Sequence, residues 1–363
     1  MNSYGFTVLQ CNHPAGVDPF TPRGSSNGLQ PTIVSKTIVP YTDNIVVGGG
    51  VKMRRFVIDT DTASDDAVAL VMALRHPDVR IEAITVVAGN VPLAQATQNA
   101  LYVVERCGRI ADVPVIPGLA KPLLRPLRTA QFCHGEDGFG DIGLDLSGRT
   151  SARGHAVDVL IQTVRRFPNE VTLVTLGPLS NLAVALLRDP ELATLVDRCV
   201  VMGGIGFGHG NVVPAAEYNI WVDPEAAKIV FESGLPITMV GWDVSHHHAT
   251  FTAEQAAHLR AVSDLAAFCV DIQRGLRNFG IQSLCQTGFD LPDPLAMAVA
   301  LEPEIATRVD RLHVAVETTS ELTRGATVVD HLRNSGNEPN ADVVLEASRE
   351  RFLNLLTRSV QEM

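Results

Sequence analysis

The amino-acid sequence predicts an α/β fold: a single large domain whose mainly parallel, Rossmann-like central sheet is flanked by helices, with helical additions toward the C-terminus. From residue 56 onward, short apolar runs alternate with helical patterns, which is typical of parallel strands joined by helices. Each apolar run ends in glycine or a polar residue, so the strand ends are expected to share one edge of the sheet. Beyond residue 250 the pattern becomes mainly helical.

The individual elements follow from these patterns. Strands are expected at residues 55–60, 81–90, 171–177, 198–204 and 236–243. Helices are expected between them at residues 65–77, 93–108, 179–189 and 223–234. The C-terminal part should contain a capping box at 252–255, a long helix at 263–278, strands at 312–317 and 326–330, and a closing helix near 348–361.

Residues 1–52 differ from the rest of the chain. Pro, Gly, Ser, Thr and Asn recur there, apolar runs are short, and the segment closes on Gly48-Gly49-Gly50. We expect a disordered or extended N-terminal segment, followed by the α/β domain at residues 53–363.

Composition narrows the possible partners. The formal net charge of −11 argues against nucleic acid or an anionic membrane, because binding either requires a basic surface. The six cysteines show no C-x-x-C spacing and are expected to be reduced thiols in the cytoplasm. No apolar run approaches the roughly 18 residues of a membrane span. A small neutral ligand or a cation is therefore the expected partner.

Polar groups at the strand ends are expected to form one site. Ligands of open α/β sheets bind outside the carboxyl ends of the strands. Those ends would bring together Asp61, Asn90, the backbone near Leu176, Met202 and Trp242.

The segment VIDTDTASDDAVAL, residues 57–70, places four aspartates within eight positions: Asp59, Asp61, Asp65 and Asp66. Two carboxylates about 4 Å apart repel by roughly 4 kcal/mol at an effective dielectric constant near 20. The dipole of the following helix offsets only about 0.3–1 kcal/mol for each, so a bound cation explains the cluster better. Oxygen ligands without His or Cys nearby favour a hard ion, and calcium more than magnesium. The alternative is that Asp65 only caps the helix while its neighbours point into solvent.

Several segments, in order along the chain, resemble motifs of the nucleoside hydrolase family, the calcium-dependent enzymes that cleave the N-glycosidic bond of ribonucleosides. The resemblance extends from residue 56 essentially to the C-terminus. The segments are DTDTASDDA (59–67), VVAGN (86–90), HGEDGFG (134–140), TLGPLSNLA (175–183), MGG with the following GN and AEYNIWVDPEAA (202–227), and DPLAMA (293–298).

This resemblance implies roles for the matching positions. Asp61 and Asp66 would bind calcium together with the backbone carbonyl of Leu176 and with Asp293, and Asp61 would also be the general base that activates a calcium-bound water. Met202 would line the floor of the site. The ribose hydroxyls would be bound by five polar side chains, Asp65, Asn90, Asn211, Glu217 and Asn219. The resemblance also implies a homodimer or homotetramer.

The chain departs from the family pattern at two places. Thr62-Ala63 replace the usual Pro-Gly of the first loop, which changes backbone freedom without removing a ligand. Pro292 stands where some family members carry a histidine that would protonate the leaving base. That proton donor is missing here.

Activation of the leaving group must then come from other residues. The candidates are His134, the run His246-His247-His248, and stacking of a purine on Trp242. Each has a structural alternative, in which His134 orients a loop, the histidine run is a solvated loop and Trp242 belongs to the core.

Two other functions fit parts of the sequence. In a phosphatase of the haloacid dehalogenase type, Asp59 would be the nucleophile and Asp61 the acid/base with magnesium, GFDLPD (288–293) would supply a distal acidic pair, and only Lys228 could serve as the late lysine. Pro292 also suits a nucleoside-binding homologue that has lost turnover.

Overall fold

The computed structural model describes residues 53–283 and 288–362. The segment predicted to be disordered or extended, residues 1–52, lies outside the described residues. The strands are β1 (Arg54–Thr60), β2 (Val79–Val86), β3 (Val115–Pro117), β4 (Val171–Thr175), β5 (Arg198–Met202), β6 (Ile237–Val240), β7 (Thr250–Thr252), β8 (Gly288–Asp290), β9 (Ala306–Leu312), β10 (Val314–Val316), β11 (Thr327–Val329) and β12 (Ala341–Ala347).

Helices are present at the four positions predicted between the strands, together with others that the sequence does not predict. They are α1 (Ser64–Leu74), α2 (Leu93–Arg106), α3 (Gln131–His134), α4 (Ala156–Arg166), α5 (Ser180–Arg188), α6 (Leu192–Leu195), α7 (Tyr218–Val222), α8 (Pro224–Phe231), α9 (Trp242–His248), α10 (Ala253–Arg260), α11 (Asp264–Asp271), α12 (Arg274–Ser283), α13 (Pro292–Leu301) and α14 (Arg349–Val360), with a short 3₁₀ helix at Pro303–Ile305.

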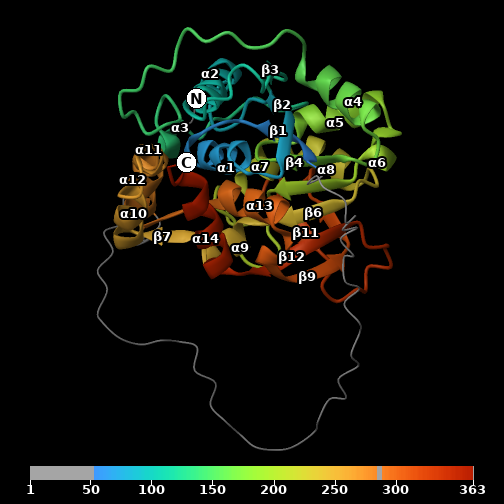
Figure 1. Ribbon diagram of the computed structural model, residues 1–363. Helices are drawn as coiled ribbons and strands as arrows, with labels where there is room; N and C mark the ends of the chain where they lie inside the picture. Colours follow the sequence, from blue (N-terminus) through green and yellow to red (C-terminus); the bar gives the residue numbers. More distant parts are fainter. Residues whose placement is uncertain (1–52, 284–287, 363) are drawn as a thin grey trace, which may run out of the picture. The chain divides into compact units, whose positions relative to one another are not determined.

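The central sheet has eight strands in the order β3-β2-β1-β4-β5-β6-β12-β9 (Figure 1). Every neighbouring pair from β3 to β12 is parallel, and β9 adds the last strand antiparallel to β12. The predicted parallel α/β fold is therefore confirmed. Strand order reverses between β1 and β4, and ligands of doubly wound sheets bind beside such a reversal.

Alternating side chains of the strands feed two hydrophobic cores, one on each face of the sheet. In β1, Phe56 and Ile58 belong to the core beneath α1, α2, α13 and α14, whereas Val57 belongs to the core beneath α4, α5 and α8. Figure 1 shows these two helical layers on either side of the strands. Because both faces are covered, the carboxyl ends of the strands are the open edge available to a ligand.

The C-terminal third differs from the prediction in two respects. The helix expected at 263–278 is two helices, α11 and α12, that separate around Gln273, whose side-chain nitrogen donates to the carbonyl oxygen of Ser64 at 2.7 Å. The strands β12 and β9 extend the central sheet, although neither was expected from the sequence. The capping box at Thr252 is present, since Gln255 N donates to the Thr252 hydroxyl and Thr252 N to the Gln255 side chain.

None of the helices in the described ranges combines the length and the apolar character needed to cross a bilayer.

Candidate active site

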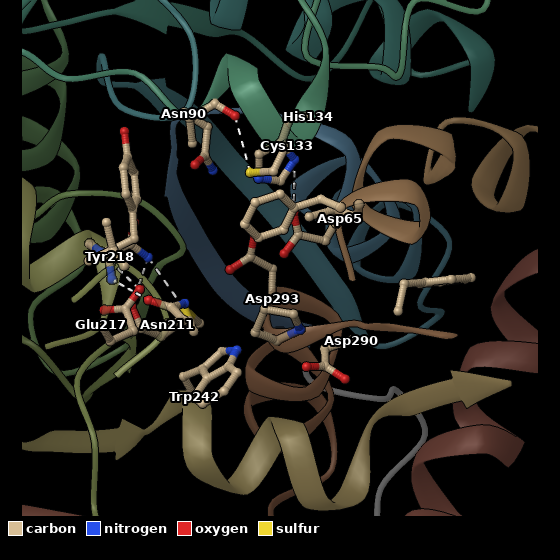
Figure 2. Close-up of a pocket in the computed structure, with 18 of the residues that line it drawn as sticks. Asp65, Asn90, Cys133, His134, Asn211, Glu217, Tyr218, Trp242, Asp290 and Asp293 are labelled. Carbon is tan, nitrogen blue, oxygen red and sulfur yellow. Dashed lines mark hydrogen bonds and ion pairs between the residues drawn. The ribbon is translucent and has the colours of Figure 1, made fainter. Parts of the chain in front are cut away.

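A pocket lies at the carboxyl edge of the sheet, where the sequence predicts the site. It is bordered by the ends of β4 and β5, by α3, α7, α12 and by the start of α13. The predicted residues on its wall are Asp65, Asn90, His134, Leu176, Met202, Asn211, Glu217, Asn219, Trp242 and Asp293. Figure 2 labels Asp65, Asn90, His134, Asn211, Glu217, Trp242 and Asp293 among them. Of the predicted site residues, Asp61 and Asp66 lie behind this wall, with both side chains fully buried.

Three aspartates meet where two helices begin. Asp65 and Asp66 lie in the first turn of α1, and Asp293 lies in the first turn of α13. One carboxylate oxygen of each lies within 4.8 Å of the other two. Each pair of negative charges at that separation repels by about 3–4 kcal/mol at an effective dielectric constant near 20. The cluster is therefore stable only with protons or with a cation between its members.

Asp61 extends this cluster from the end of β1. Its Oδ2 accepts a hydrogen bond of 2.5 Å from the backbone N–H of Asn90, whereas its buried Oδ1 has no hydrogen-bond partner among the described residues. Gly89 and Gly177 pack against the Asp61 side chain, and a Cβ at either position would collide with its carboxylate. Both glycines are required because the strand ends approach so closely here.

Burial and mutual repulsion favour protonated carboxyls in this cluster when no ion is bound. Burial, followed by the charges of Asp66 and Asp65, raises the pKa of Asp61 well above its ordinary value. Burial and the charge of Asp66 raise the pKa of Asp293 in the same way. Burial raises the pKa of Asp65 to about 6, although the nearby His134 acts in the opposite direction. A divalent ion would reverse this preference, because it stabilises the ionised carboxylates.

The donor set suits a hard cation. Asp66 is oriented by the Thr60 hydroxyl, 2.5 Å from its Oδ1, and by the backbone N–H of Ala63, 2.9 Å from its Oδ2. Asp65 Oδ1, like Asp61 Oδ1, is buried and has no hydrogen-bond partner in the part of the chain that the structure describes. Buried, unpartnered carboxylate oxygens next to further carboxylates are the ligand type that calcium prefers. With Thr62-Ala63 in place of Pro-Gly, this loop is closed by the hydrogen bond from the backbone N–H of Ala63 to Asp66 Oδ2.

The opposite wall of the pocket is built around the N-terminus of α7. The Glu217 carboxylate caps this helix by accepting from the backbone N–H groups of Asn219 and Ile220, and it also accepts from Gly204 N. Burial raises the pKa of Glu217 to about 7. The Asn219 amide donates to the carbonyl oxygen of Leu176 at 2.8 Å, and Asn211 Oδ1 accepts from the backbone N–H of Tyr218 at 3.0 Å. These side chains are fixed by backbone contacts before a ligand arrives.

His134 closes the pocket beside the aspartates. Its Nδ1 lies 3.1 Å from the Ser64 hydroxyl and 3.9 Å from Asp65 Oδ1. Burial lowers the pKa of His134, so the neutral imidazole is favoured even though the Asp65 charge opposes this effect. A structural role as a loop support and a contact with a ligand are both compatible with this placement, because the residue also faces the pocket.

Trp242, Asp290 and Pro292 form the remaining wall. The Trp242 indole stacks on the His246 ring, with centroids 4.7 Å apart and an interplanar angle of 21°. His246 Nδ1 lies 2.8 Å from Asp290 Oδ2, and this hydrogen bond raises the pKa of His246. None of the three residues of the predicted run His246-His247-His248 borders the pocket, and His246 reaches it only through its contacts with Trp242 and Asp290. Trp242 is only 7% exposed, so it serves the core and the pocket at once.

Several wall residues were not predicted as site residues. Phe132 of α3 and Phe279 of α12 meet edge to face with ring centroids 5.3 Å apart, and Cys133, Tyr218 and Phe289 also border the pocket. No sequence pattern marks them, because α3 and α12 are far apart in the chain and meet only in the folded structure. Asp290 was noticed only as part of the acidic pair in the phosphatase alternative.

The geometry does not favour that phosphatase alternative. Asp59, its expected nucleophile, is 2% exposed, and its Oδ1 accepts from the Thr85 hydroxyl and the Asn181 amide below the pocket floor. Lys228, its expected lysine, lies on α8 with its amine 3.9 Å from Glu232, on the half-exposed surface of that helix. Neither residue borders the pocket.

Known proteins resemble this chain along almost its whole described length. The model of the inosine-uridine preferring nucleoside hydrolase family matches residues 56–354. The pyrimidine-specific ribonucleoside hydrolase RihA of Salmonella dublin is 40% identical over 313 residues, which is 84% of this chain and 97% of that protein. The same enzyme of Citrobacter koseri is 40% identical over 308 residues, 83% of this chain and 96% of its own length.

Solved structures of nucleoside hydrolases also resemble this chain. A plant nucleoside hydrolase superposes with a TM-score of 0.80 at 33% identity, covering 85% of this chain and 99% of its own. The purine-preferring ribonucleoside hydrolase of Gardnerella vaginalis superposes with a TM-score of 0.78 at 31% identity, covering 85% of this chain and 98% of its own. With the matching family model and the aspartate-lined pocket, these relatives show that the chain belongs to the inosine-uridine preferring nucleoside hydrolase family.

Proposed function

We propose that this chain hydrolyses the N-glycosidic bond of ribonucleosides to ribose and free base, with calcium held by Asp61, Asp66, Asp293 and the carbonyl oxygen of Leu176. Family membership supports the reaction, and the family is metal-dependent. The observation that carries the choice of site is the cluster of buried aspartates with two unpartnered oxygens at the edge of the ligand-sized pocket.

Asp61 is the proposed general base. Calcium bound there would supply a Lewis acid that lowers the pKa of a nearby water molecule. Asp61 Oδ1 would accept a proton from the water that attacks the anomeric carbon, and the Asn90 N–H on Oδ2 keeps the carboxylate oriented. The negative charge of the surrounding carboxylates stabilises the positive charge that develops on the ribose ring.

The ribose hydroxyls are the proposed ligands of Asp65, Asn90, Asn211, Glu217 and Asn219. These carboxylates and amides line one pocket, and Glu217, Asn211 and Asn219 are preoriented by the backbone around α7. A site built to bond hydroxyl groups discriminates against sugars that lack them. We therefore expect ribonucleosides to be hydrolysed much faster than 2′-deoxyribonucleosides.

The base is the proposed partner of His134 and Trp242. His134 offers a neutral imidazole to a polar edge of the base, and Trp242 offers an aromatic surface on the pocket wall. The named relatives include pyrimidine-specific and purine-preferring enzymes, so substrates of both classes belong in any test.

The function is tested by ribose release. Wild-type protein with calcium is incubated with uridine, cytidine, inosine and adenosine, and reducing sugar is measured. We expect ribose from at least one of them and no phosphate from a phosphomonoester. Nucleoside binding without any ribose at high protein concentration would instead identify a binding protein, and phosphate release would identify a phosphatase.

A cytoplasmic location and a homodimer or homotetramer also belong to this proposal. Analytical ultracentrifugation of the full chain tests the assembly, because a dimer or tetramer sediments apart from the 39.0 kDa monomer. A monomer at micromolar concentration would contradict it.

A further inference from the structure

Negative charge develops on the base as the N-glycosidic bond breaks. The electron pair of that bond stays on a ring nitrogen of the base, and a hydrogen-bond donor beside the base stabilises it. Pro292 borders the pocket but has no N–H or O–H group to donate. Whether His134 can donate instead depends on which nitrogen of its neutral imidazole carries the proton. The contacts of Ser64 decide this.

The Ser64 and His134 side chains are held together by backbone contacts of α1 and α3. Ser64 is the first residue of α1, and its carbonyl oxygen accepts a hydrogen bond of 2.7 Å from the Gln273 side chain. His134 is the last residue of α3, and its carbonyl oxygen accepts from the backbone N–H of Gly140 at 2.8 Å. Both side chains are buried, so neither is free to turn into solvent.

The Ser64 hydroxyl has one partner. Its oxygen lies 3.1 Å from His134 Nδ1, and it makes no other hydrogen bond within the described ranges. Asp65 Oδ1 lies 3.9 Å from His134 Nδ1 and is itself without a hydrogen-bond partner there, so neither Ser64 nor His134 bonds to it. The hydroxyl proton can therefore be accepted only by His134 Nδ1.

One tautomer of His134 satisfies both groups. With its proton on Nδ1, the imidazole would donate to the Ser64 oxygen, and the buried hydroxyl proton would have no acceptor, which is unfavourable. With the proton on Nε2, the Ser64 hydroxyl donates to the Nδ1 lone pair and both groups are paired. The charge of Asp65 favours a proton on Nδ1, but this carboxylate is beyond hydrogen-bond distance, and it is proposed to bind a ribose hydroxyl in the substrate complex.

Nε2 is the ring nitrogen that remains available to a ligand. The two nitrogens of an imidazole point in different directions, so Nε2 points away from Ser64. It has no hydrogen-bond partner in the described part of the chain and is not one of the fully buried atoms without a partner, so it is reachable from the pocket that His134 borders. Figure 2 shows this imidazole beside Asp65 on the pocket wall.

We propose that Ser64 is a positioning residue that keeps His134 in the Nε2–H tautomer, so that the imidazole donates a hydrogen bond to the departing base in place of the donor that Pro292 lacks. This inference rests on the proposed function. As the bond between the anomeric carbon and the base nitrogen breaks, its electron pair stays on the base, which leaves as an anion hydrogen-bonded to Nε2–H. The attacking water forms the new carbon–oxygen bond and gives a proton to Asp61. The base then takes a proton from solvent and Asp61 returns one to solvent, so nucleoside and water become ribose and neutral base.

The tautomer is measured directly by nitrogen–proton correlation NMR of the full chain with isotope-labelled histidine, and the His134 signals are assigned by their loss in His134→Gln. In the wild type we expect the protonated nitrogen to be Nε2. In Ser64→Ala we expect a large fraction of the Nδ1–H form, since Asp65 then faces that nitrogen alone. The matched control is Ser180→Ala: Ser180 is also a buried first residue of a helix, but its hydroxyl donates to Asp223 and it does not border the pocket. This control should leave the His134 tautomer unchanged.

Kinetics test whether the tautomer assists departure of the base. We measure kcat for a nucleoside that the wild type hydrolyses and for 4-nitrophenyl riboside, whose phenolate departs without help from a donor. Only molecules in the Nε2–H form donate, so the rate falls with their fraction. We expect Ser64→Ala to lose about tenfold on the nucleoside and little on the aryl riboside, whereas Ser180→Ala should show no such difference. In a His134→Gln background, Ser64→Ala should cause no further loss, because Ser64 acts through His134.

Several results would overturn the proposal. They are a wild-type His134 with its proton on Nδ1, an unchanged tautomer in Ser64→Ala, equal losses on both substrates, and a loss that persists undiminished in the His134→Gln background. If Ser64→Ala does not fold, the wild-type spectrum decides: Nε2–H supports the proposal, and Nδ1–H contradicts it. A wild type that hydrolyses neither substrate removes the proposed function itself, a result that is distinct from the tautomer seen by NMR.

Discussion

At the scale of single residues, Asp61 combines two tasks that the fold keeps in one place. It is fully buried, its Oδ2 is oriented by Asn90 N, and its Oδ1 has no partner among the described residues. Its neighbours Asp65 and Asp66 repel its charge, which raises the pKa of Asp61 in the metal-free protein. The same carboxylate is therefore proposed both to bind the ion and to accept the proton of the attacking water.

Replacing Asp61 with Asn should separate folding from catalysis. The amide fills the same volume and cannot acquire the negative charge that its neighbours would repel, so we expect a metal-free protein at least as thermally stable as the wild type. Turnover should fall by at least about a hundredfold, since the base and an ion ligand are lost together. Ribose release and thermal unfolding measure both effects, with Asp158→Asn, which removes an exposed carboxylate paired with Arg188, as the control. Near wild-type turnover in Asp61→Asn would refute its role.

The sequence predicts some residues of the site and not others for a physical reason. Asp61 and Asn90 follow strands and Met202 ends one. The carboxyl ends of parallel strands must meet, so the convergence of these residues follows from topology. Asp290 comes from a short antiparallel pair outside the main sheet, and Phe132 and Phe279 meet through two helices far apart in the chain. No periodicity encodes such encounters, which depend on how separate elements pack.

At the scale of elements, the backbone at the end of β4 determines where the Asp61 carboxylate lies. Gly177 follows this strand, and a Cβ there would lie 2.7 Å from Asp61 Oδ1 and 2.9 Å from Asp61 N. The backbone nitrogen cannot move without displacing the end of β1. The close approach of β1 and β4 therefore depends on the absence of a side chain at position 177.

Gly177→Ala should accordingly displace Asp61. We expect a loss of about 1–3 kcal/mol in the free energy of unfolding and a fall in kcat of at least about tenfold. Gly143→Ala is the matched control: it has open space around the new Cβ but a φ of +86°, so it should cost stability without lowering kcat. Denaturant unfolding and ribose release measure the pair. Equal kcat values in the two variants would contradict the steric explanation.

Two features of the fold cannot be predicted from local sequence patterns. The strand β12 has the sequence ADVVLEA and pairs with β6. Because β6 precedes β12 by about a hundred residues, the alternation of helices and strands along the chain does not predict this pairing. The break between α11 and α12 has no Pro or Gly at its centre, and it occurs where the Gln273 side chain reaches Ser64. Both features are determined by tertiary contacts that override local preference.

At the scale of the whole molecule, the buried carboxyls couple stability to pH. In the metal-free protein, burial raises the pKa of Asp65 from 3.8 to about 6 and the pKa of Glu217 from 4.5 to about 7. Groups whose folded-state pKa is raised stabilise the fold fully below their unfolded-state pKa, and that contribution is lost as pH rises through the folded-state value. Stability of the metal-free protein should therefore decline between about pH 4 and pH 7 as these carboxyls ionise.

Calcium should oppose this decline. We expect the Tm of the chelated protein to fall between pH 5 and pH 8, and the rise in Tm on adding calcium to grow over the same range, since the ion binds the ionised carboxylates. Differential scanning calorimetry at several pH values, with chelator and with calcium, measures both trends. A calcium-induced shift that is the same at pH 5 and pH 8 would contradict the coupling.

The central claim is that the aspartate cluster hydrolyses ribonucleosides only with a divalent ion in place. The most direct measurement is ribose release from a ribonucleoside by wild-type protein before chelation, after chelation, and after calcium is added back. We predict that turnover disappears with the ion and returns with calcium. Undiminished ribose release from protein shown by elemental analysis to be free of calcium and other divalent metals would contradict the claim.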